Sequence, residues 1–441
     1  MGTSRIHLGA LALAPGAHQA AWRHRDCDPA GHRDVAFFPH VARTAERGKL
    51  DFLFLADLLG PIGADHHSPQ AFENTPYGVL EPLTLLAALS TCTEHLGLVA
   101  TSSTTVNSPY QLARIFGSLD HLSHGRAGWN VVTTPLAVER RVGVTPPRTK
   151  EELYGHAREV VDGVLAYWDT WHEKSFPRDR GQGRFVSLDG SRIPDRQGRA
   201  YRIDGPLNMP RPPQGRPVIV RAGVSDSGRG LAAEIADVVF TVQPDLAAAK
   251  AFYKDIKDRA DRAGRDPDTV RVLPGMSPFV AATEREARAG RQLMLDGLDP
   301  VVAIGEIRFL TDMDLGPYDL DGPIPDLTPT GDARHSGFLD AVRLIRENNP
   351  KMTVRGLLGA LSSGRGHPEV TGSPADVADF VEAWVDDEAC DGLVIQNPLL
   401  PDDLELFVDL VVPELQRRGR FRTAYEAATL RGNLGLAAPV R

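Results

Sequence analysis

Eight short apolar runs, each followed by a segment with helical spacing, constrain the fold of this chain more than any other feature. The runs lie at residues 6–14, 51–57, 96–104, 126–134, 217–223, 237–242, 270–281 and 391–397. Bounded apolar runs of this length predict buried parallel strands, and the helical segments predict the crossover connections. Eight such units favour a closed (β/α)8 barrel, or TIM barrel, over an open doubly wound sheet, which usually has fewer strands. No GxGxxG motif follows the first run, which argues in the same direction.

Three stretches interrupt the alternation, at about residues 58–80, 169–216 and 296–375. We interpret residues 1–441 as a single barrel domain that carries these stretches as insertions at its C-terminal mouth, where such enzymes build specificity. The third stretch is too long for a structureless loop, and "SGFLDAVRLIRENN" within it predicts a helix. We expect the first and third insertions to close over the mouth as a lid.

Charge and cysteine content argue against several classes of protein. A formal charge of -9 lacks the basic excess that a nucleic-acid or anionic-membrane partner requires. No run reaches the roughly 20 apolar residues needed to cross a bilayer. The three cysteines are far apart and show no zinc-site spacing, so the sequence predicts a cytoplasmic protein without a metal.

Mostly neutral polar residues follow the predicted strands, where a barrel of this kind places its active site. These residues are Asp57, 101–105, 130–134, 223–225, Gln396 and Asn397. No HxH motif and no carboxylate cluster accompanies them, which argues against a metal-dependent hydrolase.

The segment "VIVRAGVSDSGRGLAAEIADVVF" predicts an anion site. A strand runs into a glycine-bearing turn, and Ser225 or Asp226 then caps a helix whose free backbone N–H groups point into the mouth. A plain N-capped helix has the same local sequence, so the segment alone leaves both interpretations open.

The blocks "HGRAGWNVVTT" and "ATSSTTVNSPYQLARIFGSLDHLS" resemble the bacterial luciferase-like flavin-dependent monooxygenases. The branch is that of nitrilotriacetate monooxygenase, dibenzothiophene-sulfone monooxygenase and pristinamycin synthase. The resemblance covers most of residues 5–290 and 371–437. It implies a (β/α)8 barrel that takes FMNH2 from a separate NAD(P)H-dependent flavin reductase. The reduced FMN then reacts with O2 to give a C4a-(hydro)peroxide that inserts one oxygen atom into a small organic substrate. The family also implies a homodimer or homotetramer.

The resemblance implies roles for individual residues. The implied cofactor contacts are Asp57, Thr101, Ser102, Ser103, Asn130, Tyr154 and Ser225. Lys150, Arg221, Gly223 and Val224 are further candidates for cofactor contacts because of their positions, and the catalytic candidates are His18, Trp22, His24 and Asn130. Asn130 is expected at the polar edge of the flavin ring with Trp129 as apolar wall, while Tyr154 and Ser225 are expected to hold the phosphate. His18 and His24, with ordinary pKa values near 6.5, are candidates for a general base.

Two cations depart from the family pattern. Lys150 stands where His is common, and Arg221 gives "VRAG" where the family has "VQAG". Arg221 has three possible partners: the phosphate, a substrate carboxylate or an Asp of the chain. An anionic substrate would suit both cations.

The alternatives to a monooxygenase are an F420-dependent hydride-transfer enzyme of the same superfamily and a flavin-binding protein without turnover.

Overall fold

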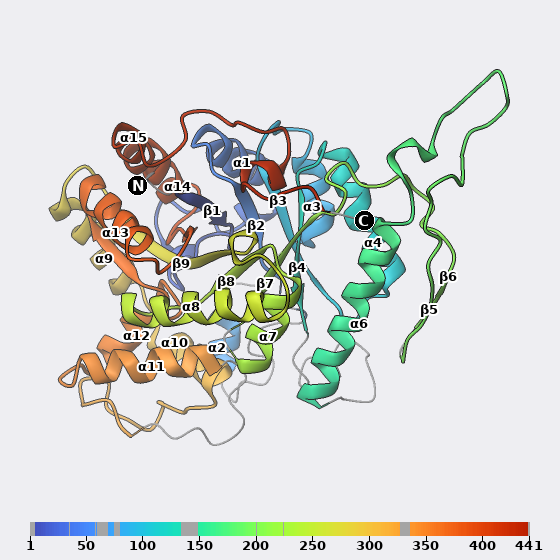
Figure 1. The fold of residues 1–441 in the computed structure, drawn as a ribbon. Coiled ribbons are helices and arrows are strands. Elements are labelled where there is room, and N and C mark those ends of the chain that lie inside the picture. Colours follow the sequence, from blue (N-terminus) through green and yellow to red (C-terminus); the bar gives the residue numbers. More distant parts are fainter. Residues whose placement is uncertain are drawn as a thin grey trace.

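A closed barrel of eight parallel strands forms the centre of the protein in this computed structural model (Figure 1). The structure describes residues 5–34, 36–57, 59, 69–74, 80–133, 149–199, 201–223, 225–326 and 336–439. The strands are β1 (His7–Leu11), β2 (Phe52–Leu55), β3 (Gly97–Ser103), β4 (Ala127–Val132), β7 (Val218–Ala222), β8 (Val238–Thr241), β9 (Arg271–Val280) and β11 (Gly392–Gln396). Their order is β9–β11–β1–β2–β3–β4–β7–β8, and pairing of β8 with β9 closes the ring. Each predicted apolar run contains one strand, so the expected (β/α)8 barrel is confirmed.

Helices connect the strands and surround the ring. They are α1 (Phe37–Arg47), α2 (Pro69–Asn74), α3 (Pro82–Leu89), α4 (Pro109–Leu122), α6 (Lys150–Trp168), α7 (Asp226–Ile235), α8 (Leu246–Arg262), α9 (Glu284–Asp296), α10 (Pro300–Thr311), α11 (Ser336–Asn348), α12 (Val354–Ser362), α13 (Pro374–Asp386), α14 (Asp402–Leu406), α15 (Val412–Arg417) and α16 (Leu430–Asn433). Local caps define several starts: Thr149 and Glu152 form a capping box on α6, and Ser108 caps α4. Within the described ranges no helix is long and apolar enough to span a bilayer.

Side chains alternate between two apolar layers along each strand. Leu11, Phe54, Val99, Val220 and Val394 belong to the cluster inside the barrel, which Leu430 and Leu434 of the C-terminal segment complete. Their strand neighbours Ala10, Leu53, Ala100, Ile219 and Ile395 pack outward in the layer that the helices cover. The place of a residue in this alternation therefore decides whether its side chain faces the interior and mouth or the helices.

The predicted insertions add structure outside the ring of strands. In the second, β5 (Asp195–Gln197) and β6 (Arg202–Asp204) form an antiparallel hairpin that extends away from the barrel beside α6 (Figure 1). In the third, α10, α11 and α12 share an apolar cluster of their own, and α11 confirms the helix predicted there. Asn74 of α2 donates from Nδ2 to Oδ2 of Asp299, 2.8 Å away, so the first and third insertions are in contact. Residues 58, 60–68, 75–79 and 327–335 of the predicted lid lie outside the described residues.

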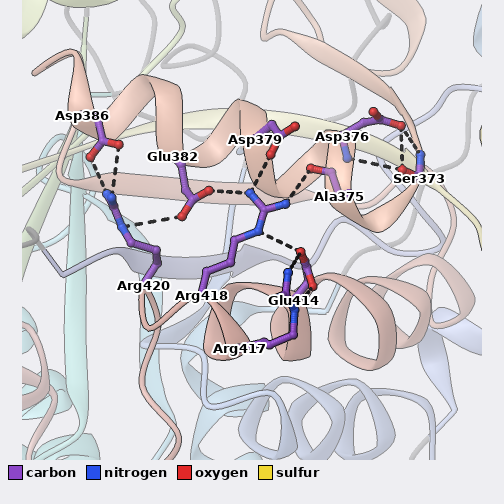
Figure 2. Close-up of polar contacts among 10 residues, drawn as sticks. All are labelled: Ser373, Ala375, Asp376, Asp379, Glu382, Asp386, Glu414, Arg417, Arg418 and Arg420. Carbon is purple, nitrogen blue, oxygen red and sulfur yellow. Dashed lines mark hydrogen bonds and ion pairs between the residues drawn. The ribbon is translucent and has the colours of Figure 1, made fainter.

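An ion-pair network joins α13 to α15 on the outside of the barrel (Figure 2). Arg418 donates to Asp379 at 2.6 Å, to Glu382 at 2.5 Å and to Glu414 at 2.8 Å. One guanidinium thus binds carboxylates of both helices, which fixes their relative orientation. Partly exposed pairs of this kind contribute little stability individually, so we assign the network a positioning role.

Candidate active site at the carboxyl ends of the strands

An aromatic pair marks the level at which the barrel interior changes from apolar to polar. Phe54 of β2 and Phe240 of β8 face inward and meet edge to face, with ring centroids 5.7 Å apart. At the C-terminal ends of other strands the inward positions hold Thr101, Asn130 and Gln396, all buried. The mouth therefore has an apolar floor, and these three described positions on its rim are polar and uncharged.

Asn130 carries a buried polar atom that the protein does not satisfy. Its side chain is 3% exposed, and Nδ2 donates to Oγ1 of Thr101 on the neighbouring strand at 2.9 Å. Oδ1 has no hydrogen-bond partner. Because an unpaired buried amide oxygen costs free energy, an orphan at the mouth of a barrel indicates a ligand group that donates to it. Thr101 and Asn130, both predicted as site residues, are thus brought together.

Trp129, the next residue on β4, points the opposite way. It is completely buried in the outer layer, where its ring lies 5.5 Å from Phe116 and 6.5 Å from Trp168 between ring centroids. Its Nε1 donates to the carbonyl of Ser102 at 3.0 Å. The expectation that Trp129 forms a wall of the flavin pocket is wrong, because neighbouring side chains of a strand face opposite sides of the sheet.

Ser225 and Tyr154, the two residues predicted to hold an anion, lie together at the start of α7. Ser225 is the N-cap of α7, and its Oγ accepts from the backbone N–H of Gly228 at 3.2 Å. The hydroxyl of Tyr154, on the first turns of α6, lies 3.2 Å from the same Oγ. A Cβ on Gly228 would lie 2.9 Å from that oxygen, so glycine keeps the approach open. Asp226, the other candidate cap, instead bonds Arg259.

Arg221 lies behind this anion site. Because Val220 faces the interior, Arg221 faces outward, and its guanidinium is 5.7 Å from the ring centroid of Tyr154. One terminal N–H donates to the carbonyl of Val131 at 2.6 Å, while Nε has no partner. Burial lowers the pKa of this guanidinium. No carboxylate of the described residues pairs with Arg221, so an Asp, one of its three possible partners, is not found there.

The first loop places its three candidates in different surroundings. His18 is buried, its Nδ1 accepts from the backbone N–H of Ala20 at 3.0 Å, and its Nε2 lies 3.3 Å from Oγ of Ser362. Burial, aided by the charge of Arg291, lowers the pKa of His18 to about 4. Both ring nitrogens are therefore engaged and the ring is neutral.

Trp22 and His24 lie further along the same loop. Trp22 lines a cavity of about 210 Å³ together with Gln19, Arg23, Asn74, Gly297, Asp299 and Val302. His24 turns toward Asp26, whose carboxylate is 3.7 Å from Nδ1. This cavity lies between the first loop and the start of α10, and the structure gives it no lining residue from the strand ends.

The remaining predicted residues lie close to the strand ends. Asp57 is half-buried two positions beyond β2, and Gly223 directly follows β7. Ser102 accepts from Nδ2 of Asn107 at 3.4 Å, and Oγ of Ser103 accepts from the N–H of Thr105 at 3.1 Å. Val224, Thr134 and the side chain of Lys150 lie outside the described residues.

The sequence did not predict His367, which the structure places at the mouth. Its ring stacks on Phe240, with centroids 5.3 Å apart and planes 29° apart. Burial lowers its pKa to about 3. The residue lies within 296–375, which the family resemblance does not cover. The signal that was available is the short run after "GRGHP", which forms β10 (Glu369–Gly372) beside β9.

A family model described as luciferase-like monooxygenase matches residues 16–389, which is most of the chain. This protein belongs to that family. A relative of this luciferase-like monooxygenase, nitrilotriacetate monooxygenase component A from Aminobacter aminovorans, is 42% identical over 447 residues, with 100% of this chain and 98% of the relative aligned.

Two solved structures share the fold of this luciferase-like monooxygenase. The crystal structure of DmoA from Hyphomicrobium sulfonivorans superposes with a TM-score of 0.89 at 28% identity, covering 98% of this chain and 92% of that one. Riboflavin lyase RcaE, solved with modified FMN and riboflavin, gives 0.85 at 30% identity and covers 99% and 97%. The orphaned Asn130 oxygen and the capped helix with its glycine approach fit a ligand with an amide-like edge and an anionic tail, as FMN has.

Proposed function

We propose that this luciferase-like monooxygenase is the oxygenating component of a two-component system. It would bind reduced FMN from a separate NAD(P)H-dependent flavin reductase and transfer one oxygen atom of O2 to a small organic substrate. The observation that carries the proposal is the anion site of Ser225 and Tyr154 beside the unsatisfied Oδ1 of Asn130. The word component in the name of the relative from Aminobacter aminovorans supports the two-component arrangement.

Each end of the cofactor has residues suited to it. A phosphate beside Ser225 would accept from the free backbone N–H groups at the start of α7 and from the hydroxyl of Tyr154, and it would gain from the helix dipole. The charge of Arg221, buried without a carboxylate partner, would compensate the phosphate from behind Tyr154. We therefore assign Arg221 to the phosphate and not to a substrate carboxylate.

The ring would lie over the apolar floor, with its polar edge toward the strand ends. Oδ1 of Asn130 would accept a hydrogen bond from the ring, while Thr101 keeps the amide oriented by accepting from Nδ2. Phe54 and Phe240 exclude water from below. The reduced flavin supplies the activation of O2, and the protein supplies orientation and a dry site. His18 stays neutral and orders the first loop.

The test is reconstitution from separate parts. Purified protein is mixed anaerobically with reduced FMN, and binding is followed by the change in flavin absorbance. Oxygen consumption is then measured with NADH and a flavin reductase, and candidate substrates are screened by mass spectrometry for a gain of one oxygen atom. Saturable binding with an oxygenated product supports the proposal. Failure to bind reduced FMN refutes it, and reduction of F420 by an alcohol without oxygen uptake points to the hydride-transfer alternative.

A further inference from the structure

A second pair of unsatisfied polar atoms lies across the mouth from Asn130. Nε2 of Gln396 and Nδ1 of His367 have no hydrogen-bond partner, although the two residues are only 2% and 7% exposed. Gln396 ends β11, which is four strands from β4 in a ring of eight, so the two sites lie on opposite walls. Buried polar atoms normally find partners, and the function proposed above does not use these two.

The two atoms are held over the same backbone position. A Cβ on Gly275 of β9 would collide with both Nε2 of Gln396 and Nδ1 of His367, so this glycine makes room for them. The stacking of His367 on Phe240 fixes the plane of the imidazole. The next residue on the chain, Asn397, is also buried, and neither its Nδ2 nor its Oδ1 is bonded. The wall is thus a rigid, polar surface with unused hydrogen-bonding capacity.

Among the residues that the structure describes, this wall carries no free charge. Burial keeps the imidazole of His367 neutral, as its lowered pKa indicates. The positive charge of Arg365 also acts on the His367 imidazole. This charge is already paired, because Nε of Arg365 lies 2.7 Å from Oε1 of Glu306. An ionised group brought here would be buried without a counter-ion, which costs far more than an unpaired neutral group.

We propose that Gln396 and His367 bind an uncharged amide of the substrate. The amide carbonyl accepts from Nε2 of Gln396, and the amide N–H donates to Nδ1 of His367 in the tautomer protonated at Nε2. A carboxylate has no N–H for that nitrogen and brings the charge that this wall does not compensate. The inference rests on the proposed function, since a flavin anchored near Ser225 and Asn130 leaves the wall of β9 and β11 to the substrate.

The test compares two small ligands that differ only in having an amide or a carboxylate, 3-(methylthio)propanamide and 3-(methylthio)propanoate. Each is titrated by saturation-transfer NMR into the full chain, once with oxidised FMN present and once without. We expect the amide to bind at least about tenfold more tightly than the carboxylate. Gln396→Leu should remove that preference. Gln292→Leu, which changes an exposed amide on α9, is the matched control and should leave it intact.

A second variant, His367→Phe, tests the inference independently in case Gln396→Leu does not fold. His367→Phe keeps an aromatic ring on Phe240 while removing Nδ1, and it should also reduce amide binding about tenfold. Equal or tighter binding of the carboxylate, no saturable binding of the amide, or an unchanged preference in both variants overturns the inference. A tenfold loss of FMN affinity in Gln396→Leu also overturns it, because the amide would then serve the flavin edge. If the wild type does not bind FMN, the proposed function fails, but the titration without FMN still decides the inference.

Discussion

The hydroxyl of Tyr154 lies 3.2 Å from the hydroxyl of Ser225, although 71 positions separate the two residues. Tyr154 stands near the start of α6 and Ser225 at the start of α7, so the packing of two successive helices on the barrel brings together the two hydroxyls that we propose hold the phosphate. The hydrogen bond also orients both hydroxyls before a ligand arrives, which reduces the entropy lost on binding.

Replacing Ser225 with Ala should weaken FMN binding by about tenfold to a hundredfold. The change removes one hydrogen bond to a charged group, worth roughly 1.5–3 kcal/mol, and leaves the phosphate less well oriented. It also removes the N-cap of α7, at a cost of about 1 kcal/mol in folding stability. Fluorescence quenching of FMN measures the affinity and urea melts measure the stability.

Ser108→Ala separates these two effects of the Ser225 change. Ser108 caps α4 through its hydrogen bond from Gln111 but is no part of the anion site. The Ser108→Ala variant should lose a similar amount of folding stability and retain its affinity for FMN. Equal losses of affinity in both variants would show that the effect at Ser225 comes from helix stability alone.

Asn130→Leu should cost FMN affinity without costing stability. The Asn130 side chain has one satisfied and one unsatisfied atom, and the leucine side chain fills a similar volume without an orphaned oxygen. We expect the free energy of unfolding of the FMN-free protein to change by less than about 1 kcal/mol, because removing the orphaned Oδ1 offsets the cost of leaving the Thr101 hydroxyl without its donor. The FMN dissociation constant should rise about tenfold. A destabilised variant with unchanged affinity would assign Asn130 to folding.

The barrel and the capped start of α7 were predictable because both depend on local signals. Apolar runs of strand length fix the order of the sheet, and a serine after a glycine-bearing turn fixes the start of α7. The orientation of Trp129 was not predictable in this way. Leu98 and Val99 of the neighbouring strand are both apolar, so only the structure shows that Val99 faces the interior and that Trp129 therefore faces the helices.

The position of His367 depends on tertiary packing that no local pattern contains. Gly275, Phe240 and Gln396 come from three different strands. His367 reaches the mouth because Gly275 has no side chain to block it and Phe240 stacks on its ring, beside Gln396. The same holds for Arg221, whose place behind Tyr154 depends on how α6 packs against β7. Short-range patterns predict which residues end strands, and only the packed structure shows which of their polar atoms remain unsatisfied.

Folding stability should fall as the pH drops below about 6.5, in part because of His18. Its pKa of about 4 in the folded protein lies below the unfolded value of 6.5, so the unfolded chain takes up the proton first. The stability associated with the neutral ring is complete above pH 6.5 and is lost as the pH falls toward 4. Between pH 7 and 4.5 this amounts to about 2–3 kcal/mol, and urea melts at the two pH values should show it.

His18→Gln isolates the contribution of this ring. The variant should have a smaller pH dependence of stability by roughly the same 2–3 kcal/mol. His40→Gln is the matched control, since it makes the same substitution at an exposed histidine that lies beside Glu405. An unaltered pH dependence in His18→Gln would mean that the imidazole titrates normally in the folded protein and remains available as a general base.

Arg221→Gln should weaken FMN binding by about tenfold and leave the substrate KM nearly unchanged. Glutamine is smaller than arginine and keeps a polar N–H donor, so the variant should fold and lose the buried charge. Losing the buried cation behind Tyr154 removes attraction to the phosphate. The salt dependence of FMN binding should barely change, because a buried charge is screened less than an exposed one. Lys254→Gln, at an exposed cation on α8, should alter neither constant. A large rise in the substrate KM of Arg221→Gln, with unchanged FMN affinity, would show instead that Arg221 binds a carboxylate of the substrate.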